Sequence, residues 1–379
     1  SLGTLFQYDP SVNVLTKKID FGISIDGNKP AGSLMQASNK KLYGMTTLGG
    51  SNGMGALFQY DVTTKGYTKK IDFTGTANGA NPSGSLIEAS DGKLYGMTNN
   101  GGINNMGVIF QYDPATSVYV KKTDFDGIAK GKHSFGSLLQ ANDGKLYSMT
   151  YYGGTNNEGV LFLYNPITNA YVKKIDFNGG ALGANPLGSL MQASDGKLYG
   201  VASNGGANNK GVLFQYNIVT NAYVKKVDFS TSDGFHPCGT LVQAPDGKLY
   251  GTCKEGGVNG MGILFQFDPV SNICSKKIDF AGIANGMAPS GALMVASNGM
   301  LYGATTMGGT NNKGVLYQYD PVNNVFTKRL DFNGVNGYNH YYNHLIELTL
   351  SVNTGTLNTN RCTNNTFYLQ YTARGAFDP

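Results

Sequence analysis

Four short apolar runs recur along the chain in a fixed order. In one complete unit they cover residues 188–193 (GSLMQA), 197–202 (KLYGVA), 212–217 (VLFQYN) and 222–229 (AYVKKVDF). Each run contains aromatic or β-branched residues or other apolar side chains and is bounded by Gly, Asn, Asp or Ser, which is typical of β-strands. No segment sustains a helical period, so we predict four strands, named a to d in this order.

Tight turns and one longer loop connect these predicted strands. Asp195-Gly196 separates strands a and b, and an Asp-Gly connection favours a hairpin because Gly tolerates positive φ. A Gly/Asn loop at 205–211 joins strands b and c, and a short turn at 218–221 joins strands c and d. The unit therefore predicts a four-stranded antiparallel sheet.

The unit repeats along most of the chain. Copies of the Leu-Tyr pair in strand b are 52 residues apart, except for one interval of 51 residues. A period of this length indicates supersecondary units that bury their apolar faces on one another, and four-stranded blades arranged radially form a β-propeller. The pair recurs at Tyr43, Tyr95, Tyr147, Tyr199, Tyr250 and Tyr302.

The two ends of the chain supply parts of one more unit. Strands c and d come first, at 3–21, six complete units follow, and an a-like strand lies at 344–348. We therefore predict an all-β fold over 1–348: a seven-bladed β-propeller of four-stranded antiparallel blades, with the ring closed by N- and C-terminal strands. The tail, 349–379, contains a strand-bearing segment at 362–377. It either completes the last blade or starts a truncated β-sandwich domain.

Charged residues are sparse, at 14 %, and the net charge is +5. Much of the positive charge comes from one Lys pair per unit, such as Lys173-Lys174, so we expect no clustered basic face for nucleic acid. Lys on an edge strand opposes pairing with another chain, which places strand d outermost; a ring of anion-binding lysines is the alternative. Lys122 and Asp124 are expected to pair with each other or with a neighbouring blade. No apolar run is long enough for a transmembrane helix.

The unit at 82–125 resembles the GloVer (Gloeo/Verruco) tandem repeat of bacterial secreted proteins. It shares DGKLYG, a double Gly, a Gly-x-[LIV]-Phe segment and a closing Asp-Phe, and all six complete units match. The layout is also similar to the kelch repeat, although Tyr119 and its equivalents replace the kelch Trp. The GloVer resemblance implies a bacterial protein that is exported or surface-anchored, with no catalytic residues to carry over, and the kelch similarity supports the propeller only. The tail from Thr356 resembles the opening of a β-sandwich domain in Bacteroidota exported proteins.

The longer loops identify the face on which binding is expected. In a blade of this order the b–c and d–a loops open on one face, and the short a–b and c–d turns open on the other. Exposed loops on a rigid scaffold commonly carry function, so we predict the b–c/d–a face as the binding face.

One Asn recurs in every b–c loop. A structural role is favoured, in which the side chain bonds nearby backbone or the residue adopts a left-handed conformation. A calcium site fits poorly because these loops lack carboxylates, and a multivalent sugar site is the remaining alternative. The column comprises Asn52, Asn104, Asn156, Asn208, Asn259 and Asn311.

A second column lies just before strand a. If strand a is innermost, this column surrounds the mouth of a central channel, where it forms either a polar funnel or a site for an anionic or sugar ligand. A shared metal is disfavoured because Zn–N bonds are only about 2.0–2.1 Å long and alternate blades are far apart. The column comprises Lys29, Asn81, His133, Asn185, His236, Ala288 and His340.

A third series, close behind in strand a, is expected to line the channel or to let the inner strands approach closely. It comprises Ser33, Ser85, Ser137, Ser189, Thr240, Ala292 and His344. Tyr151 and Tyr152 are departures from the repeat at the start of one b–c loop. They either stack on a sugar ring or pack on a neighbouring loop. The candidate binding residues are therefore His133, His236, His340, Asn81, Asn185, Tyr151 and Tyr152.

The four cysteines suggest no catalytic role. Cys238 on strand a and Cys253 at the end of strand b lie across one hairpin, where a disulfide or two free thiols are both compatible with the spacing. Cys274, two strands from b, is expected to be a buried free thiol, and Cys362 has no evident partner. No Cys is paired with a base, as a nucleophile would require.

Nearly identical blades offer few positions for the asymmetric constellation that catalysis needs. We therefore predict a non-enzymatic, secreted or cell-surface binding or scaffold module, such as an adhesion protein. We expect it to bind protein or glycan, to need no cofactor, and to be monomeric or part of a larger surface assembly. One alternative is a multivalent lectin-like propeller. A second is a hydrolase or lyase at the channel mouth, using the histidines with Glu88, Glu158, Glu255 or Glu347.

Overall fold

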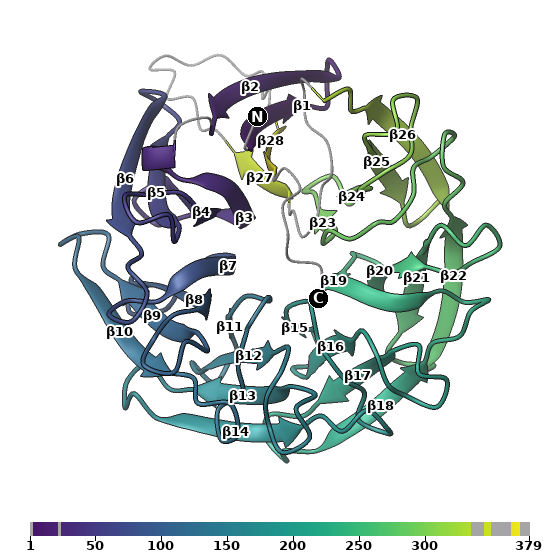
Figure 1. Ribbon diagram of the computed structural model, residues 1–379. Coiled ribbons are helices and arrows are strands. Elements are labelled where there is room, and N and C mark those ends of the chain that lie inside the picture. The colour runs from purple at the N-terminus through teal and green to yellow at the C-terminus, as the bar shows by residue number, and fades with distance from the viewer. Residues whose placement is uncertain (1–2, 22–23, 335–344, 350–364, 372–379) are drawn as a thin grey trace, which may run out of the picture.

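The computed structural model describes residues 3–21, 24–334, 345–349 and 365–371. Its four-stranded antiparallel sheets are arranged radially around a common centre, like the blades of a propeller (Figure 1). The one helical element among the described residues is a 3-10 turn, η1 (Ser24–Asp26). In the part of the chain that is described, none of the helical structure is long and apolar enough to cross a membrane.

Six blades are each formed by four consecutive strands. Blade 1 contains β3 (Asn28–Gln36), β4 (Leu42–Leu48), β5 (Ala56–Asp61) and β6 (Gly66–Asp72). Blade 2 contains β7 (Ala80–Glu88), β8 (Leu94–Asn100), β9 (Val108–Tyr112) and β10 (Tyr119–Asp124). Blade 3 contains β11 (Leu139–Gln140), β12 (Leu146–Thr150), β13 (Val160–Tyr164) and β14 (Tyr171–Asp176).

The remaining three blades follow the same order. Blade 4 contains β15 (Met191–Gln192), β16 (Leu198–Ala202), β17 (Val212–Tyr216) and β18 (Tyr223–Asp228). Blade 5 contains β19 (Phe235–Gln243), β20 (Leu249–Glu255), β21 (Ile263–Asp268) and β22 (Ile273–Asp279). Blade 6 contains β23 (Met294–Val295), β24 (Leu301–Ala304), β25 (Val315–Asp320) and β26 (Val325–Asp331). The predicted propeller of four-stranded antiparallel blades is confirmed, with strand a innermost and strand d outermost (Figure 1).

A further sheet, which we call the terminal sheet, takes its strands from both ends of the described chain. Its order is β2 (Val14–Asp20), β1 (Thr4–Asp9), β28 (Asn365–Tyr371) and β27 (Leu345–Thr349). β28 lies between β1 and β27 and pairs antiparallel with both.

The terminal sheet contacts the blades on both sides of it. Asn13 Nδ2 donates to the backbone oxygen of Arg329 in blade 6, at 3.1 Å. Leu5 and Phe21 share a buried cluster with Leu34 and Phe58 of blade 1. The first and last described strands therefore lie together, between blades 6 and 1 (Figure 1).

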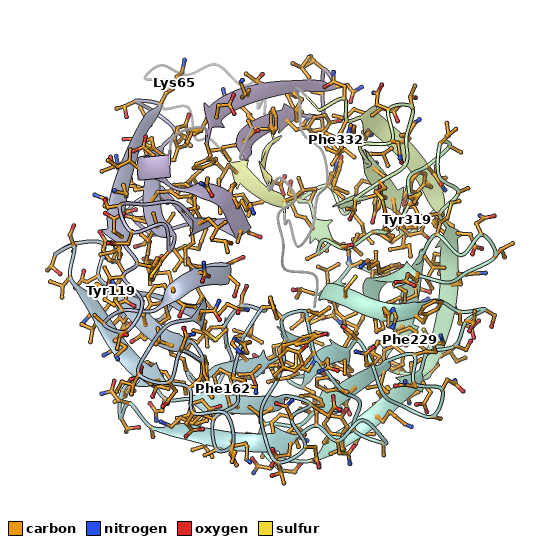
Figure 2. All side chains as sticks on the ribbon, viewed as in Figure 1. Lys65, Tyr119, Phe162, Phe229, Tyr319 and Phe332 are labelled. Carbon is orange, nitrogen blue, oxygen red and sulfur yellow. The ribbon has the colours of Figure 1, made fainter. Side chains whose placement is uncertain are left out.

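The apolar side chains of each blade are buried against the next blade. One cluster combines Tyr43 and Met45 of blade 1 with Leu86, Leu94 and Phe110 of blade 2. Figure 2 shows side chains filling the space between adjacent blades around the ring. Because burial of each Leu or Phe contributes about 1.5–3 kcal/mol, a blade depends on its neighbours for most of its core.

The innermost strands of several blades are joined by hydrogen bonds between blades, which are not part of the β-sheet pairing within a blade. The backbone N–H of one blade donates to the hydroxyl of the next blade in four successive pairs. These are Ser33 to Ser85 (2.7 Å), Ser85 to Ser137 (2.7 Å), Ser137 to Ser189 (2.8 Å) and Ser189 to Thr240 (3.3 Å). The third sequence series therefore lets inner strands approach closely and bonds them together; its last member, His344, lies outside the described residues.

The glycine before each of these residues makes the approach possible. A Cβ added to Gly32 would lie 2.0 Å from the carbonyl oxygen of Gly84, and one added to Gly84 would lie 2.4 Å from that of Gly136. The ladder is irregular at this place, with a register shift in β7 between Ser83 and Ile87. In blade 4 the predicted strand at 188–193 is reduced to β15, although Ser189 makes the same bond as Ser33 and Ser85, which lie within nine-residue strands.

The outer strands contradict the first of the two alternatives predicted for Lys122 and Asp124, that they pair with each other. Asp124 pairs with Lys121, at 3.0 Å, and not with Lys122. A bulge between Lys121 and Thr123 interrupts the alternation of faces on which the prediction depended. The same pairing, Lys to the Asp three residues later, occurs at Lys17–Asp20, Lys69–Asp72, Lys173–Asp176, Lys225–Asp228, Lys276–Asp279 and Lys328–Asp331.

The second Lys of the pair connects neighbouring blades in two places. Lys174 Nζ donates to Asn221 Oδ1 and Lys226 Nζ donates to Asn272 Oδ1, both at 2.8 Å. Exposed contacts of this kind each contribute at most about 1 kcal/mol, so the inner junction and the apolar clusters dominate cohesion.

Ser137→Ala removes the acceptor for the Ser85 N–H at the inner junction. We expect the free energy of unfolding to fall by about 1–3 kcal/mol, as for a donor left without its partner. Thr240→Ser is the matched control because it keeps the hydroxyl that accepts from Ser189. Urea unfolding checks this, and equal stability of Ser137→Ala and the wild type would contradict the bonding role.

Candidate binding face

The residues just before strand a connect neighbouring blades through their backbone. The six described members of this column, Lys29, Asn81, His133, Asn185, His236 and Ala288, all have positive φ, between 51° and 55°. Several of their amides reach back to the preceding b–c loop: Asn81 N–H donates to the oxygen of Met54 and His133 N–H to that of Met106. His340 lies outside the described residues.

Three predicted ligand-binding side chains also span these junctions. Asn81 Nδ2 donates to Thr47 O (3.0 Å), and Asn185 Nδ2 donates to Tyr151 O (3.2 Å). His133 Nδ1 lies 2.9 Å from Asn99 O. Because a carbonyl oxygen only accepts, Nδ1 of His133 carries the proton and Nε2 keeps a free lone pair.

His133 is neutral near pH 7. Burial lowers its pKa below the ordinary value, the bond to Asn99 opposes this shift, and the positive charge of Lys132 adds to it. The imidazole therefore presents a hydrogen-bond acceptor at Nε2 at neutral pH.

In blades 2 to 5 the column residue has a partner at the end of strand b, and the partners differ between blades. In blades 2 and 4 both members are Asn: Asn100 donates to Asn81 (3.0 Å) and Asn204 to Asn185 (3.1 Å). In blade 3 His133 lies beside Tyr152, with ring centroids 6.3 Å apart. In blade 5 the corresponding pair is ionisable, His236 with Glu255. Among blades 2 to 5, blades 3 and 5 are thus the two in which this pair is not Asn with Asn.

Tyr151 and Tyr152 have different environments. Tyr151 is 6 % exposed, its ring meets Phe135 edge-on (centroids 5.3 Å apart), and burial together with the charges of Tyr152 and Glu158 raises its pKa to about 12. Tyr152 is half-buried and stands perpendicular to Tyr151, with centroids 4.5 Å apart. Tyr151 therefore packs within the protein, and Tyr152 keeps accessible surface. We call His133, Phe135, Tyr151, Tyr152 and Glu158 the blade-3 rim cluster.

A second group of residues that differ from the repeat lies at blade 5. We call it the blade-5 rim cluster: Lys210, Phe235, His236 and Glu255. His236 Nδ1 lies 3.3 Å from Glu255 Oε1, and these side chains are 38 % and 43 % exposed. Lys210 Nζ lies 4.1 Å from the centroid of the Phe235 ring, which in turn contacts the ring of His236. Blade 4 separates the two clusters, so the structure does not bring His133 and His236 into one site.

The recurring Asn of the b–c loop has the structural role favoured from the sequence. In five blades its Nδ2 donates to the backbone oxygen of the last Phe of strand d, at 2.9–3.2 Å. Asp124 Oδ1 accepts the N–H of Ile103, which fixes the same loop from the other side. Five of the six Asn residues are thus occupied in holding the loop: Asn104, Asn156, Asn208, Asn259 and Asn311.

The b–c and d–a loops lie against each other, as expected for a shared face. Gly102 N–H donates to Gly75 O and Gly154 N–H donates to Gly127 O. Met106 fills the space above Gly127, where an added Cβ would lie 3.2 Å from its sulfur. Each rim cluster includes a residue of a b–c loop, Glu158 or Lys210.

The three cysteines in the described part of the chain are free thiols, so the Cys238–Cys253 disulfide that the sequence left open does not form in this structure. Cys238 is opposite Thr252, and Cys253 is opposite Pro237, which places the two side chains on opposite faces of the hairpin. Burial raises the pKa of Cys238 to about 12 and that of Cys253 well above its ordinary value. Cys274 is also free but only partly buried, and Cys362 lies outside the described residues.

The four Glu residues considered for the enzyme alternative lie in two kinds of environment, blade junctions and rim clusters. Glu88 accepts from Ser38 and Glu347 accepts from Ser297 of the preceding blade, so both serve blade junctions. Glu158 and Glu255 belong to the separate rim clusters. Within the described ranges, no group of three or more His, Cys, Asp or Glu side chains is arranged to hold a metal ion.

The fold and the repeat together define a β-propeller built from near-identical blades. The chain belongs to the Gloeobacter/Verrucomicrobia repeat family, which it matches over residues 1–192 and 171–368. The predicted family resemblance is therefore confirmed. A sequence search of curated proteins finds no match.

Solved structures with a similar fold have very different sequences. A proposed 6-phosphogluconolactonase from Bacteroides uniformis ATCC 8492 has 13% identity and a TM-score of 0.58, over 86% of this chain and 95% of that one. An oligogalacturonate lyase from Vibrio parahaemolyticus has 12% identity and a TM-score of 0.55, over 86% and 85%. The extracellular domain of a proposed hybrid two-component system from B. thetaiotaomicron has 14% identity and a TM-score of 0.55, over 90% and 40%. At these identities the likeness shows the fold alone.

His133 is expected to titrate below its ordinary pKa of 6.5 because its charged form is penalised by burial. A lowered pKa in the folded state means that its contribution to stability is complete above the unfolded value and is lost as pH falls through the folded value. NMR titration of the imidazole protons measures the pKa directly. His133→Asn, which keeps a donor for Asn99 as Asn81 does for Thr47, is the control for the unfolding measurements. A pKa at or above 6.5 would contradict this environment.

Proposed function

We propose that this protein is a non-enzymatic binding or scaffold propeller that contacts its partner through the b–c/d–a face. The observation that carries the proposal is that the repeated side chains and the side chains that differ between blades have different roles. Residues shared by the blades, such as Asn104, Asp124 and Ser137, bond to the protein's own backbone. In blades 2 to 5 the aromatic and ionisable departures from the Asn pair lie in the two rim clusters, so those clusters distinguish this part of the face from a regular repeat.

The partner we propose is a protein or a glycan at a cell surface. The resemblance to a tandem repeat of bacterial secreted proteins supports the proposal of an exported or surface location, where an adhesion or scaffolding role would be exerted. Neither rim cluster is large enough to be an interface alone. The intervening loops would complete the contact, because surface loops on a rigid scaffold tolerate the sequence variation that recognition needs.

The alternative to a binding protein is an enzyme. Propellers of this fold include the proposed 6-phosphogluconolactonase and the oligogalacturonate lyase named above, which motivates testing those two reactions. The rim clusters give the alternative little support because each contributes a single carboxylate, Glu158 or Glu255. Hydrolysis assisted by an acid and a base would need further groups converging on one position.

We also propose that the terminal sheet is the seventh blade and that it closes the ring. Three contacts support this: Asn13 with Arg329, Ser297 with Glu347, and Leu5 within the cluster of blade 1. The Ser297–Glu347 contact is equivalent to the Ser38–Glu88 contact between blades 1 and 2. The other two join the terminal sheet to blade 6 and to blade 1. Closure would hold the b–c/d–a loops of all blades in one rigid arrangement.

Leu5→Ala tests closure, because Leu5 is fully buried against blade 1. We expect a loss of about 2–5 kcal/mol in the free energy of unfolding, as for a core Leu, and a larger loss on deleting residues 1–21. Val12→Ala, at a side chain that is 63 % exposed, is the control and should change stability by less than about 0.5 kcal/mol. Unaltered unfolding of Leu5→Ala would mean that the terminal sheet is not part of the folded ring.

The contact face is tested by a pair of double variants. Tyr152→Asn with Glu255→Asn alters the rim, using the residue that blades 2 and 4 have there. Ile167→Ser with Val219→Ser alters c–d turns on the opposite face, where these side chains are 88 % and 83 % exposed. We expect the rim variant to lose about tenfold or more in affinity, equivalent to about 1.4 kcal/mol, and the turn variant to bind like the wild type.

Binding is measured on a printed panel of bacterial and host glycans together with immobilised collagen, fibronectin and mucin. Loss of binding only in the turn variant would assign the contact to the other face. The same preparations are assayed with 6-phosphogluconolactone and with oligogalacturonate. Turnover that the rim variant lacks would replace the binding proposal with the enzyme alternative.

A further inference from the structure

The blade-3 rim cluster departs from the repeat at several adjoining positions at once. Where blade 3 has His133, Phe135, Tyr151, Tyr152 and Glu158, the equivalent residues of blade 2, 52 positions earlier, are Asn81, Ser83, Asn99, Asn100 and Met106. The junction bonds are nevertheless the same, because His133 and Asn81 both donate to the end of strand b in the preceding blade. The substitutions therefore add aromatic surface and acceptors without changing how the blades are joined.

The aromatic residues form a supported platform. Tyr151 is buried between Phe135 and Tyr152, and its ring is nearly perpendicular to both, at 86° and 90°. This contact restricts the ring of Tyr152, which is only half-buried. A Tyr held in this way offers rigid, amphipathic contact area at a low cost in conformational entropy. Its ring can cover the C–H face of a flat, partly apolar ligand.

The polar groups beside the platform accept hydrogen bonds. His133 directs its only N–H to Asn99, so Nε2 offers a lone pair. Glu158 supplies a carboxylate in the adjoining b–c loop, and its negative charge contributes to the raised pKa of Tyr151. Acceptors of this kind require a ligand that carries hydroxyl or N–H donors.

The local charges favour a neutral ligand. Glu158 disfavours an anion, and the ammonium of Lys132, which acts on His133, disfavours an organic cation. An aromatic surface with acceptors and balanced charge fits the ring of a neutral sugar: C–H groups meet Tyr152 and hydroxyl groups donate to the acceptors. The blade-5 rim cluster lacks this character because Lys210 already lies over the Phe235 ring.

We propose that the blade-3 rim cluster is a binding site for one neutral sugar ring. The inference rests on the proposed function, since it names the ligand class for one part of the b–c/d–a face. Tyr152 stacks on the sugar, Tyr151 and Phe135 position Tyr152, and His133 Nε2 and Glu158 accept hydrogen bonds from hydroxyl groups.

The chain contains no Trp, so a single introduced Trp reports on its own position. Tyr152→Trp keeps an aromatic platform at the site, and Asn204→Trp places the same reporter at the equivalent position of blade 4. The probes are neutral methyl glycosides of glucose, galactose, mannose and N-acetylglucosamine. We expect at least one of them to change the emission of Tyr152→Trp in a saturable manner and to leave that of Asn204→Trp unchanged.

His133→Asn in the Tyr152→Trp background tests the acceptor. It keeps a donor to Asn99 and removes Nε2, so we expect about tenfold weaker binding, as for one lost hydrogen bond. Saturation-transfer NMR of the wild type against Tyr152→Asn provides a second measurement that needs no Trp. Transfer to the same glycosides in the wild type and its loss in Tyr152→Asn would support the site.

Several results would overturn the inference. They are no response to any neutral glycoside by either method, or an equal response from Asn204→Trp. Glucuronic acid and tetramethylammonium serve as charged control probes, and a response to these alone would also overturn it. In these cases the contact face stands if the rim double variant still loses a partner from the printed panel. If the sugar site is found but the panel partner binds through the c–d turns, the contact face fails and the sugar site stands.

Discussion

The close junction of the innermost strands is the constraint on which the rest of the molecule depends. Around this junction the N–H of one blade donates to a Ser or Thr hydroxyl of the next, and only Gly at the preceding position admits the approach of the two backbones. An ordinary side chain at Gly32 or Gly84 would collide with backbone that cannot move aside. The junction fixes the inner ends of the blades, and the apolar clusters then fill the widening space between them.

This constraint explains why so little of the repeat is available for recognition. The Asn of the b–c loop, the Asp of strand d and the residue before strand a all bond to backbone within a blade or across a junction. A ligand would have to compete with those bonds. In blades 3 and 5, by contrast, the partner of the residue before strand a is Tyr152 or Glu255, where blades 2 and 4 have Asn. The backbone bond from His133 or His236 to the preceding b–c loop is kept. Function is therefore expected where the sequence departs from its own pattern.

The sequence predicted the blade, its strand order and the structural role of the loop Asn because each depends on short-range patterns. It did not predict features that depend on β-bulges, on strand register or on contacts between blades. The bulge at Lys121 transferred the ion pair from Lys122 to its neighbour, and the hairpin register placed Cys238 and Cys253 on opposite faces. The hydroxyl bonds between blades join residues about one repeat apart, which no local pattern reveals. Phe135 was overlooked, although alignment with Ser83 would have marked it beside Tyr151.

The central claim is that shared residues hold the blades and that departures carry recognition. The most direct test gives blade 3 the rim of blade 2, through His133→Asn, Phe135→Ser, Tyr151→Asn, Tyr152→Asn and Glu158→Met together. Thermal unfolding and binding to the printed panel are then measured on the same preparation. The account predicts a midpoint within a few degrees of the wild type and loss of binding. A folded variant with undiminished binding, or a collapse in stability without a specific loss of binding, would contradict it.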